Sequence, residues 1–136
     1  MSYSNDQVLE NMIKNWTRID MLLELYERTI AAVRMAQMAQ AADDKAQMQL
    51  QVYESHKLIL AIHSGLKVDE SEIAHNVARL LGFIVLRIDE GNFEEALQFL
   101  ENLRSGYSGI REEAVALEAS GEISPLQSAN VVDAMA

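Results

Sequence analysis

Glu72 and His75 are the residues whose types and spacing come closest to a chemical site. Residues three apart share one face of a helix, and bundles that hold two iron ions use two Glu-x-x-His pairs with two further inward glutamates. The other two histidines have Tyr53 and Leu60 three residues before them, so there is no second pair. An acid at a helix start is also expected from the helix dipole alone. The sequence therefore predicts no metal site and no other cofactor.

Phosphoryl transfer is a second chemistry that His75 could serve. Residues 74–77 resemble the Ala-His-x-Leu start of histidine phosphotransfer domains, which are four-helix bundles with an exposed histidine on a central helix. The Lys and Gly of that family, which balance phosphate charge and give access, are Ala78 and Arg79 here. His75 also lies off the apolar seam of its helix, as an ordinary solvated histidine would. Phosphotransfer through His75 is an alternative to the main interpretation below.

The composition is that of an acidic chain without cysteine. Its 136 residues include 21 acidic and 11 basic side chains, which give a net charge of −10. Nucleic acids and anionic membrane surfaces attract basic faces, so the sequence predicts neither as a partner. Without cysteine there is no disulfide and no thiolate metal site. No apolar run approaches membrane-spanning length and no signal pattern opens the chain, which predicts a cytoplasmic location.

The secondary-structure signals are almost entirely helical. Ala, Leu, Gln, Glu and Met dominate, all of them helix formers, whereas strand alternation and Asn-Gly or Asp-Gly turns are missing. Apolar residues at three- and four-residue steps predict helices over about 18–41, 44–65, 69 or 71 to 91, and 92–119. Tight connections favour antiparallel neighbours. We therefore predict an all-α fold, an antiparallel up-down four-helix bundle.

Capping residues and glycines mark the expected boundaries of these helices. Thr17 with Asp20 three residues later has the capping-box pattern. Further N-caps are expected at Asp44, at Asp69 or Ser71, and at Asn92. Gly106 and Gly109 weaken the last helix, which we still expect to run on to Ala119.

The chain divides into three segments. Residues 1–17 form a lead-in whose apolar spacing from Val8 to Trp16 fits a short amphipathic helix, although the chain could also run through as one helix. The bundle occupies residues 18–120. Residues 121–136 are a tail of small residues around Pro125, and we expect this tail to be weakly held.

The third predicted helix is more apolar than one buried face requires. Its seam is formed by Ile73, Val77, Leu80, Ile84 and Ile88. Leu81, Phe83, Val85 and Leu86 are apolar as well and point elsewhere. A helix that is apolar nearly all round needs a further covering surface. We therefore expect Leu81, Val85 and Leu86, with Leu58 of the second helix, to line an apolar groove for a partner.

Three stretches together resemble the flagellar export chaperone family FliS. Residues 21–26, Met-Leu-Leu-Glu-Leu-Tyr, followed by Ile30, are similar to the Leu-x-x-x-Leu-Tyr opening of that family's first long helix. Residues 73–80 resemble its Ile-Ala-x-Asn-Leu-x-x-Leu pattern, which continues here through Arg87 and Asn92. Residues 103–107 resemble its Leu-Arg-x-x-Trp ending, with Tyr107 in place of Trp. The likeness covers about residues 13–110.

The resemblance implies a cytoplasmic chaperone that binds the disordered C-terminal segment of flagellin and prevents premature polymerisation. It implies no enzyme activity. Arg28 stands where the family has a small Gly, and a bulky side chain there would narrow a groove for a partner helix. The partner-binding residues that we predict are Tyr26, Ile30, Leu58, Leu81, Val85 and Leu86.

A third interpretation is self-association. The surplus apolar face could also be covered by a second copy of the chain, which would make a homodimer with no enzymatic activity.

Overall fold

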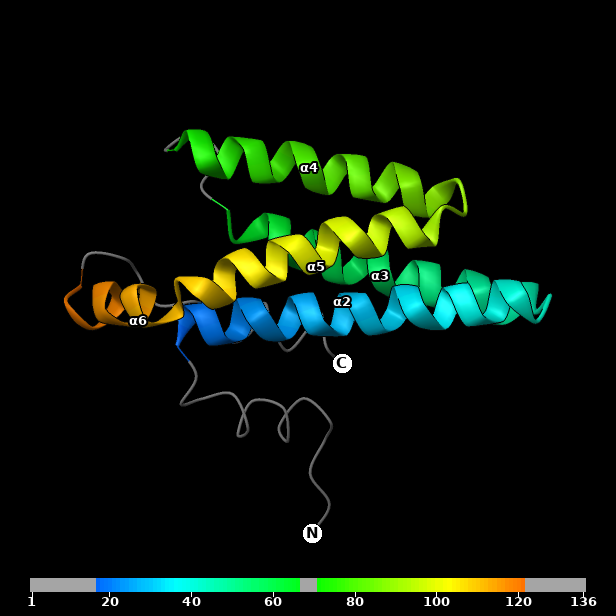
Figure 1. The fold of residues 1–136 in the computed structure, drawn as a ribbon, viewed down its shortest axis with the longest axis horizontal. Coiled ribbons are helices and arrows are strands. Elements are labelled where there is room, and N and C mark those ends of the chain that lie inside the picture. Colours follow the sequence, from blue (N-terminus) through cyan, green and yellow to red (C-terminus); the bar gives the residue numbers. More distant parts are fainter. Residues whose placement is uncertain (1–16, 67–70, 122–136) are drawn as a thin grey trace, which may run out of the picture.

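The computed structural model describes residues 17–66 and 71–121, and every regular element in them is helical (Figure 1). The predicted all-α class is confirmed. The short helix expected before Thr17 and the tail expected beyond Gly121 lie outside the described residues. The helices are α2 (Arg18–Ala41), α3 (Lys45–Ser64), α4 (Glu72–Asp89), α5 (Phe93–Gly109) and α6 (Arg111–Ala119).

Helices α2 to α5 form the predicted bundle. Each of the four packs against its neighbour in sequence, and α5 returns to pack against α2, which leaves α2 and α4 diagonally opposed. Successive helices run in opposite directions, as the colours along the chain show in Figure 1. None of the described helices has both the length and the apolarity that crossing a membrane requires.

Each of the four bundle helices is capped at its N-terminus by a side chain, at a position that the sequence predicts. Thr17 accepts from the amide of Asp20, whose carboxylate accepts in turn from the backbone of Thr17, so the capping box is formed. This extended Thr17 excludes one continuous helix through position 17. The other helices are capped at their first turns by Asp44, Ser71 and Asn92.

The prediction of a single last helix over about residues 92–119 is wrong, because the structure has two helices there. The chain leaves helical geometry at Ile110, and α6 begins at Arg111 without a side-chain cap. Gly106 and Gly109 lower the helix propensity of the preceding turn, and polar contacts hold α6 in its own direction. Arg111 pairs with Asp20, and Glu118 accepts from the amide of Arg18, both at the start of α2. α6 itself has no buried residue.

The buried seam of α4 differs from the predicted one. Val77, Ile84 and Ile88 are buried as expected, but the fourth member is Leu81, which is 1% exposed. Ile73 is 75% exposed and Leu80 is half-buried. The expectation that Leu81 is surplus to the core is therefore wrong.

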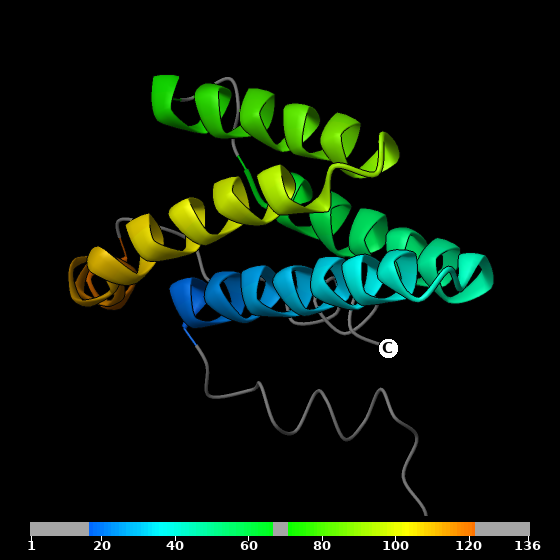
Figure 2. The same ribbon diagram turned by 45° about the vertical axis from the view of Figure 1, so that its right-hand side comes forward.

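The reason lies in the angle between α4 and α5. Figures 1 and 2 show that the two helices meet at the turn before Phe93 and diverge toward the N-terminus of α4. Ile73 lies at the wide end, where none of the helices that the structure describes covers it. Leu81 lies near the middle of α4, where its side chain meets α5 and the rest of the core.

Candidate functional site

The apolar surface of α4 is the candidate partner-binding site. Leu86 is 56% exposed, and Val85 beside it in sequence is half-buried. Gly82, one turn before Leu86, has open space where a Cβ would stand. An exposed leucine next to an uncovered glycine leaves room for an approaching helix. These two of the six predicted residues are thus accessible to a partner.

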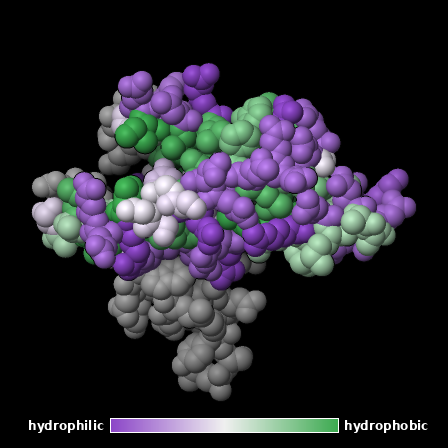
Figure 3. All heavy atoms as spheres, in the orientation of Figure 1, coloured by the Kyte–Doolittle hydropathy of each residue, from purple (hydrophilic) through white to green (hydrophobic). Residues whose placement is uncertain are grey.

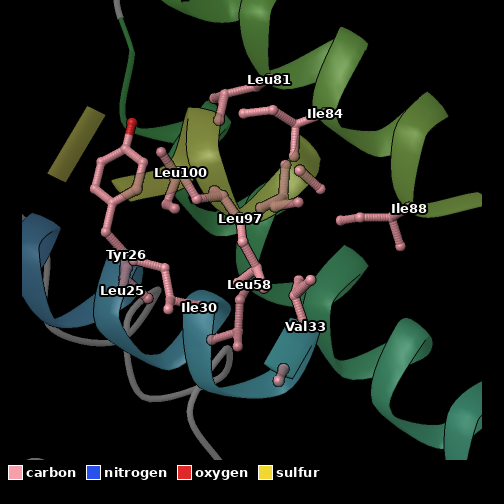
Figure 4. Close-up of a cluster of buried hydrophobic side chains, with 14 of the residues drawn as sticks. Leu25, Tyr26, Ile30, Val33, Leu58, Leu81, Ile84, Ile88, Leu97 and Leu100 are labelled. Carbon is pink, nitrogen blue, oxygen red and sulfur yellow. The ribbon is translucent and has the colours of Figure 1, made fainter. Parts of the chain in front are cut away.

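The other four predicted residues belong to the core. Tyr26, Ile30, Leu58 and Leu81 are each 5% exposed or less. Figure 4 shows them pointing from three different helices into one cluster with Leu97 and Leu100 of α5. The expectation that Leu81 faces an open groove is wrong, because its side chain is buried in this cluster. Leu58 is also largely buried, although it is one of the residues that line a small hollow between α2 and α3.

Tyr26 is a polar residue within this cluster. Its ring stacks on that of Tyr107, with centroids 5.6 Å apart and planes inclined by 27°. Its hydroxyl has no hydrogen-bond partner of acceptable geometry among the described residues. Burial, reinforced by the neighbouring Tyr107, raises the pKa of Tyr26 far above its usual value, so the phenol stays neutral. The pair joins α2 to the end of α5.

A second apolar surface lies in the opening between α4 and α5. Ile73 is exposed there, while Leu80, Phe83 and Phe99 are half-buried. The two phenylalanine rings meet edge to face at 5.3 Å, and Arg87 lies over Phe83. Figure 3 shows hydrophobic residues gathered between these helices, with polar residues above and below. The surface is therefore an apolar strip with a polar border.

Two hollows flank α3. The larger, about 480 Å³, lies where α3 approaches the α4–α5 turn and is lined by Tyr53, His56, Ile88 and Phe93 among others. His56 Nε2 lies 2.8 Å from Asp89 Oδ1 and joins α3 to the end of α4. The smaller, about 250 Å³, lies between α2 and α3, and Arg28 is one of its lining residues.

Arg28 is the residue whose bulky side chain is expected from the sequence to narrow a groove for a partner helix. Its Nε donates to Glu24 Oε1 at 3.0 Å, one turn earlier in α2. The guanidinium is thereby held along its own helix at the edge of the smaller hollow. A small residue at this position would leave the hollow wider.

His75 lies in the first turn of α4 and is exposed. Ser71 caps that turn through the amide of Ala74. Within residues 17–66 and 71–121, no three His, Cys, Asp or Glu side chains are grouped so that they could hold a metal ion.

The sequence reasoning missed the exposed apolar residues of α3. Leu50, Tyr53 and Leu60 all lie on its surface. The signal was present, because these positions are three and seven residues apart and so share the side of the helix opposite Ser55, Ile59 and Ile62. One buried seam per helix accounts for the core of the bundle, and α3 has apolar residues on a second side as well.

Comparison with protein families gives one match. The family described as flagellar protein FliS matches residues 1–114, most of the chain. No match was found among curated proteins or among solved structures.

Proposed function

The chain belongs to the FliS family of flagellar chaperones, and from this premise we propose that it binds the C-terminal segment of flagellin. In this proposal the chain acts in the cytoplasm, prevents premature polymerisation of flagellin before secretion, and catalyses no reaction. The family membership carries the proposal. The apolar surface of α4 supports it.

The physical basis is helix-in-groove recognition. A disordered segment that folds on binding loses conformational entropy, so it needs extensive apolar contact to offset that cost. An amphipathic helix supplies such contact at positions three and four residues apart. Ile73 and Leu86 are exposed on two different sides of α4. Val85, the residue before Leu86, is half-buried. A segment that wraps α4 could use both sides.

The six predicted residues take two roles in this proposal. Val85 and Leu86 contact the flagellin segment directly. The four core residues support the helices that present this surface, and these are Tyr26, Ile30, Leu58 and Leu81.

Phosphotransfer through His75 is the alternative of a different class. His75 is exposed, as a phosphate acceptor would be, but Arg79 occupies the place of the small residue one turn later. Incubation with a small-molecule phosphodonor, followed by mass spectrometry of the intact chain, separates the two functions. Phosphorylation at His75 would favour the alternative.

The test of the main proposal is binding of a flagellin C-terminal peptide to Leu86→Asp and Ile73→Asp variants. Both side chains are exposed, so neither change should cost much folding stability. We expect each variant to bind the peptide at least about tenfold more weakly by calorimetry, because a charge replaces an apolar contact. Urea denaturation of each variant measures stability in parallel.

Met38→Asp is the matched control. Met38 is an exposed apolar residue on α2, distant in sequence from α4, so this variant makes the same kind of change elsewhere. It should bind as the unaltered chain does. Failure of the unaltered chain to bind the peptide would refute the proposal, and equal weakening by Met38→Asp would refute the assignment to α4.

A further inference from the structure

The larger hollow beside α3 combines an apolar interior with an acidic rim. Its volume of about 480 Å³ is within the range of ligand-binding pockets. Two of its lining residues, Ile88 and Phe93, are almost fully buried, and Val52 is half-buried. Asp89 and Glu90 also line the hollow and are exposed. A group that fits this hollow is therefore apolar along its length and polar at its end.

The charge of the hollow is negative. The described residues that line it include two carboxylates and no lysine or arginine. Gln40 and Asp89 place it at the C-terminal ends of α2 and α4, where the helix dipoles add partial negative charge. The start of α3 has the opposite partial charge, but the lining residues of α3 begin at Met48, beyond its first turn. The polar end of a matching group is therefore a cation.

Both carboxylates keep an accepting oxygen. His56 Nε2 lies 2.8 Å from Oδ1 of Asp89, and Arg87 Nη1 lies 3.0 Å from Oε2 of Glu90. Among the described residues, none donates to the other oxygen of either carboxylate. A guanidinium presents several N–H groups in one plane, so it suits two neighbouring carboxylates better than the single ammonium of lysine does.

Tyr53 adds an aromatic wall to this acidic rim. It lines the hollow and is 65% exposed. Guanidinium groups stack on aromatic rings, and the attraction between cation and ring adds to that of the carboxylates. The aliphatic stem of an arginine would at the same time cover the apolar interior beside Val52 and Phe93. The lining thus matches each part of an arginine side chain.

The exposed side of α3 next to the hollow favours an arginine that belongs to a protein. Tyr53 and Leu60 are each 65% exposed and are seven residues apart, so they lie on the same side of α3, two turns from each other. A small cation in the hollow would leave Leu60 in water. A helix that lies along α3 would bring an apolar residue onto Leu60 when its arginine is in the hollow.

We propose that the larger hollow binds an arginine side chain of a partner protein, carried on an amphipathic helix that packs along α3. The guanidinium donates to Asp89 and Glu90, and an apolar residue two turns away on the partner contacts Leu60. The net charge of −10 attracts such a basic helix. The site uses none of the residues tested for flagellin binding, so it does not rest on the proposed function.

Titration of the isotope-labelled full chain with N-acetyl-arginine methylamide, followed by NMR, tests the arginine site. The amides of residues 48–56 and 88–93 should shift, with a dissociation constant in the millimolar range. The citrulline compound has the same shape without the charge and should bind at least about threefold more weakly. The lysine compound should also bind more weakly than the arginine compound, because its ammonium lacks the planar set of donors.

Asp89→Asn and Glu90→Gln test the two carboxylates separately. Each should raise the dissociation constant of the arginine compound at least about threefold, because a charge-assisted hydrogen bond is lost. Glu113→Gln is the matched control, since it removes one exposed acid from α6, outside the hollow. It should leave the constant unchanged. The dispersion of the NMR spectrum shows whether each variant is folded.

A pair of alanine-rich peptides tests the helical partner. Each carries one arginine, with leucines seven residues on either side of it in the first peptide and five residues on either side in the second. Only the first places a leucine on the same side of the helix as the arginine. It should bind at least about tenfold more tightly than the second, and Leu60→Ser should remove this difference. Equal binding of the two peptides would overturn the helical partner.

Three results of the titration would overturn the arginine site. One is the absence of shifts around the hollow at the highest soluble concentration of the arginine compound. The second is equal binding of the arginine and citrulline compounds. The third is binding of spermidine at the hollow more tightly than either the arginine compound or the first peptide, which would assign the hollow to a free polyamine. Because none of these probes is flagellin, the outcome is separate from that of the flagellin-peptide test.

Discussion

Two neighbouring leucines on α4 show how position on a helix decides the role of a side chain. Leu81 is 1% exposed and Leu86 is 56% exposed, although the two are five residues apart in one apolar run. Five residues on a helix turn the side chain by about 140° from the starting direction. Leu81 therefore enters the core between α4 and α5, while Leu86 faces away from it.

The residue-scale prediction compares these two leucines. Leu81→Ala should lower the free energy of unfolding by about 2–5 kcal/mol, because a cavity remains among well-packed neighbours. Leu86→Ala should change it by no more than about 0.5 kcal/mol. Urea denaturation followed by circular dichroism measures both. A loss for Leu86→Ala as large as that for Leu81→Ala would mean that Leu86 is covered in solution.

At the scale of the elements, the turn between α4 and α5 decides where the apolar surface opens. Gly91 has a φ of +77°, in the left-handed region that glycine enters without strain. Its carbonyl accepts from Gln40 Nε2 at 3.2 Å, which ties the turn to the end of α2. The two helices are thus held together at this end and diverge at the other.

Gly91 and Gly82 give a matched pair of substitutions. Gly91→Ala should destabilise the chain by roughly 1–2 kcal/mol, because alanine is strained at this φ. Its Cβ would also stand 2.9 Å from Gln40 Nε2. Gly82→Ala should stabilise the chain by up to about 1 kcal/mol, since Gly82 is inside α4 with open space around it.

Thermal and urea unfolding of both alanine variants check this pair. Stabilisation by Gly91→Ala would show that the turn has another conformation in solution.

At the scale of the whole molecule, α6 is joined to the bundle mainly by polar contacts. Arg111 donates to both carboxylate oxygens of Asp20, at 2.6 and 3.2 Å. The carboxylate of Glu118 accepts from the amide of Arg18 at 2.7 Å. Both contacts are at the N-terminus of α2, where the helix dipole favours negative charge. The stability of this end of the molecule therefore depends on hydrogen bonds that the side chains of Asp20 and Glu118 accept.

The pH dependence of stability follows from Asp20. The hydrogen bond from Arg111, with those of Thr17, holds the pKa of Asp20 below its usual value. The folded chain thus binds the proton less tightly than the unfolded chain, so Asp20 contributes stability above the unfolded pKa of about 4. That contribution is lost as pH falls through the lower folded pKa.

The measurement compares the unaltered chain with Asp20→Asn. The difference in free energy of unfolding between them should be largest near pH 7 and should shrink as pH falls below about 4. Glu113→Gln, at an exposed position on α6, is the control and should show a smaller difference at every pH. A difference for Asp20→Asn that grows on acidification would contradict the assignment.

The sequence by itself determined the helical class, the antiparallel order of the four bundle helices and their capping residues, apart from the choice between Asp69 and Ser71 at the third. These follow from local chemistry: Thr17, Asp44, Ser71 and Asn92 satisfy free amides of their own helices, and tight connections join neighbours. The motifs of residues 21–26 and 73–80 likewise identified the family. All of these features depend on residues that are near one another along the chain.

Only the tertiary structure decided which apolar residues are covered. Local spacing shows that α3 and α4 are apolar on more than one side, but exposure depends on which helix lies opposite and at what angle. The divergence of α4 from α5 exposes Ile73, and the packing of α5 buries Leu81, in both cases against the sequence prediction. The break at Ile110 has the same origin, since the contacts of α6 with α2 join residues about ninety positions apart. Burial is a property of pairs of helices, and a single helical pattern does not contain it.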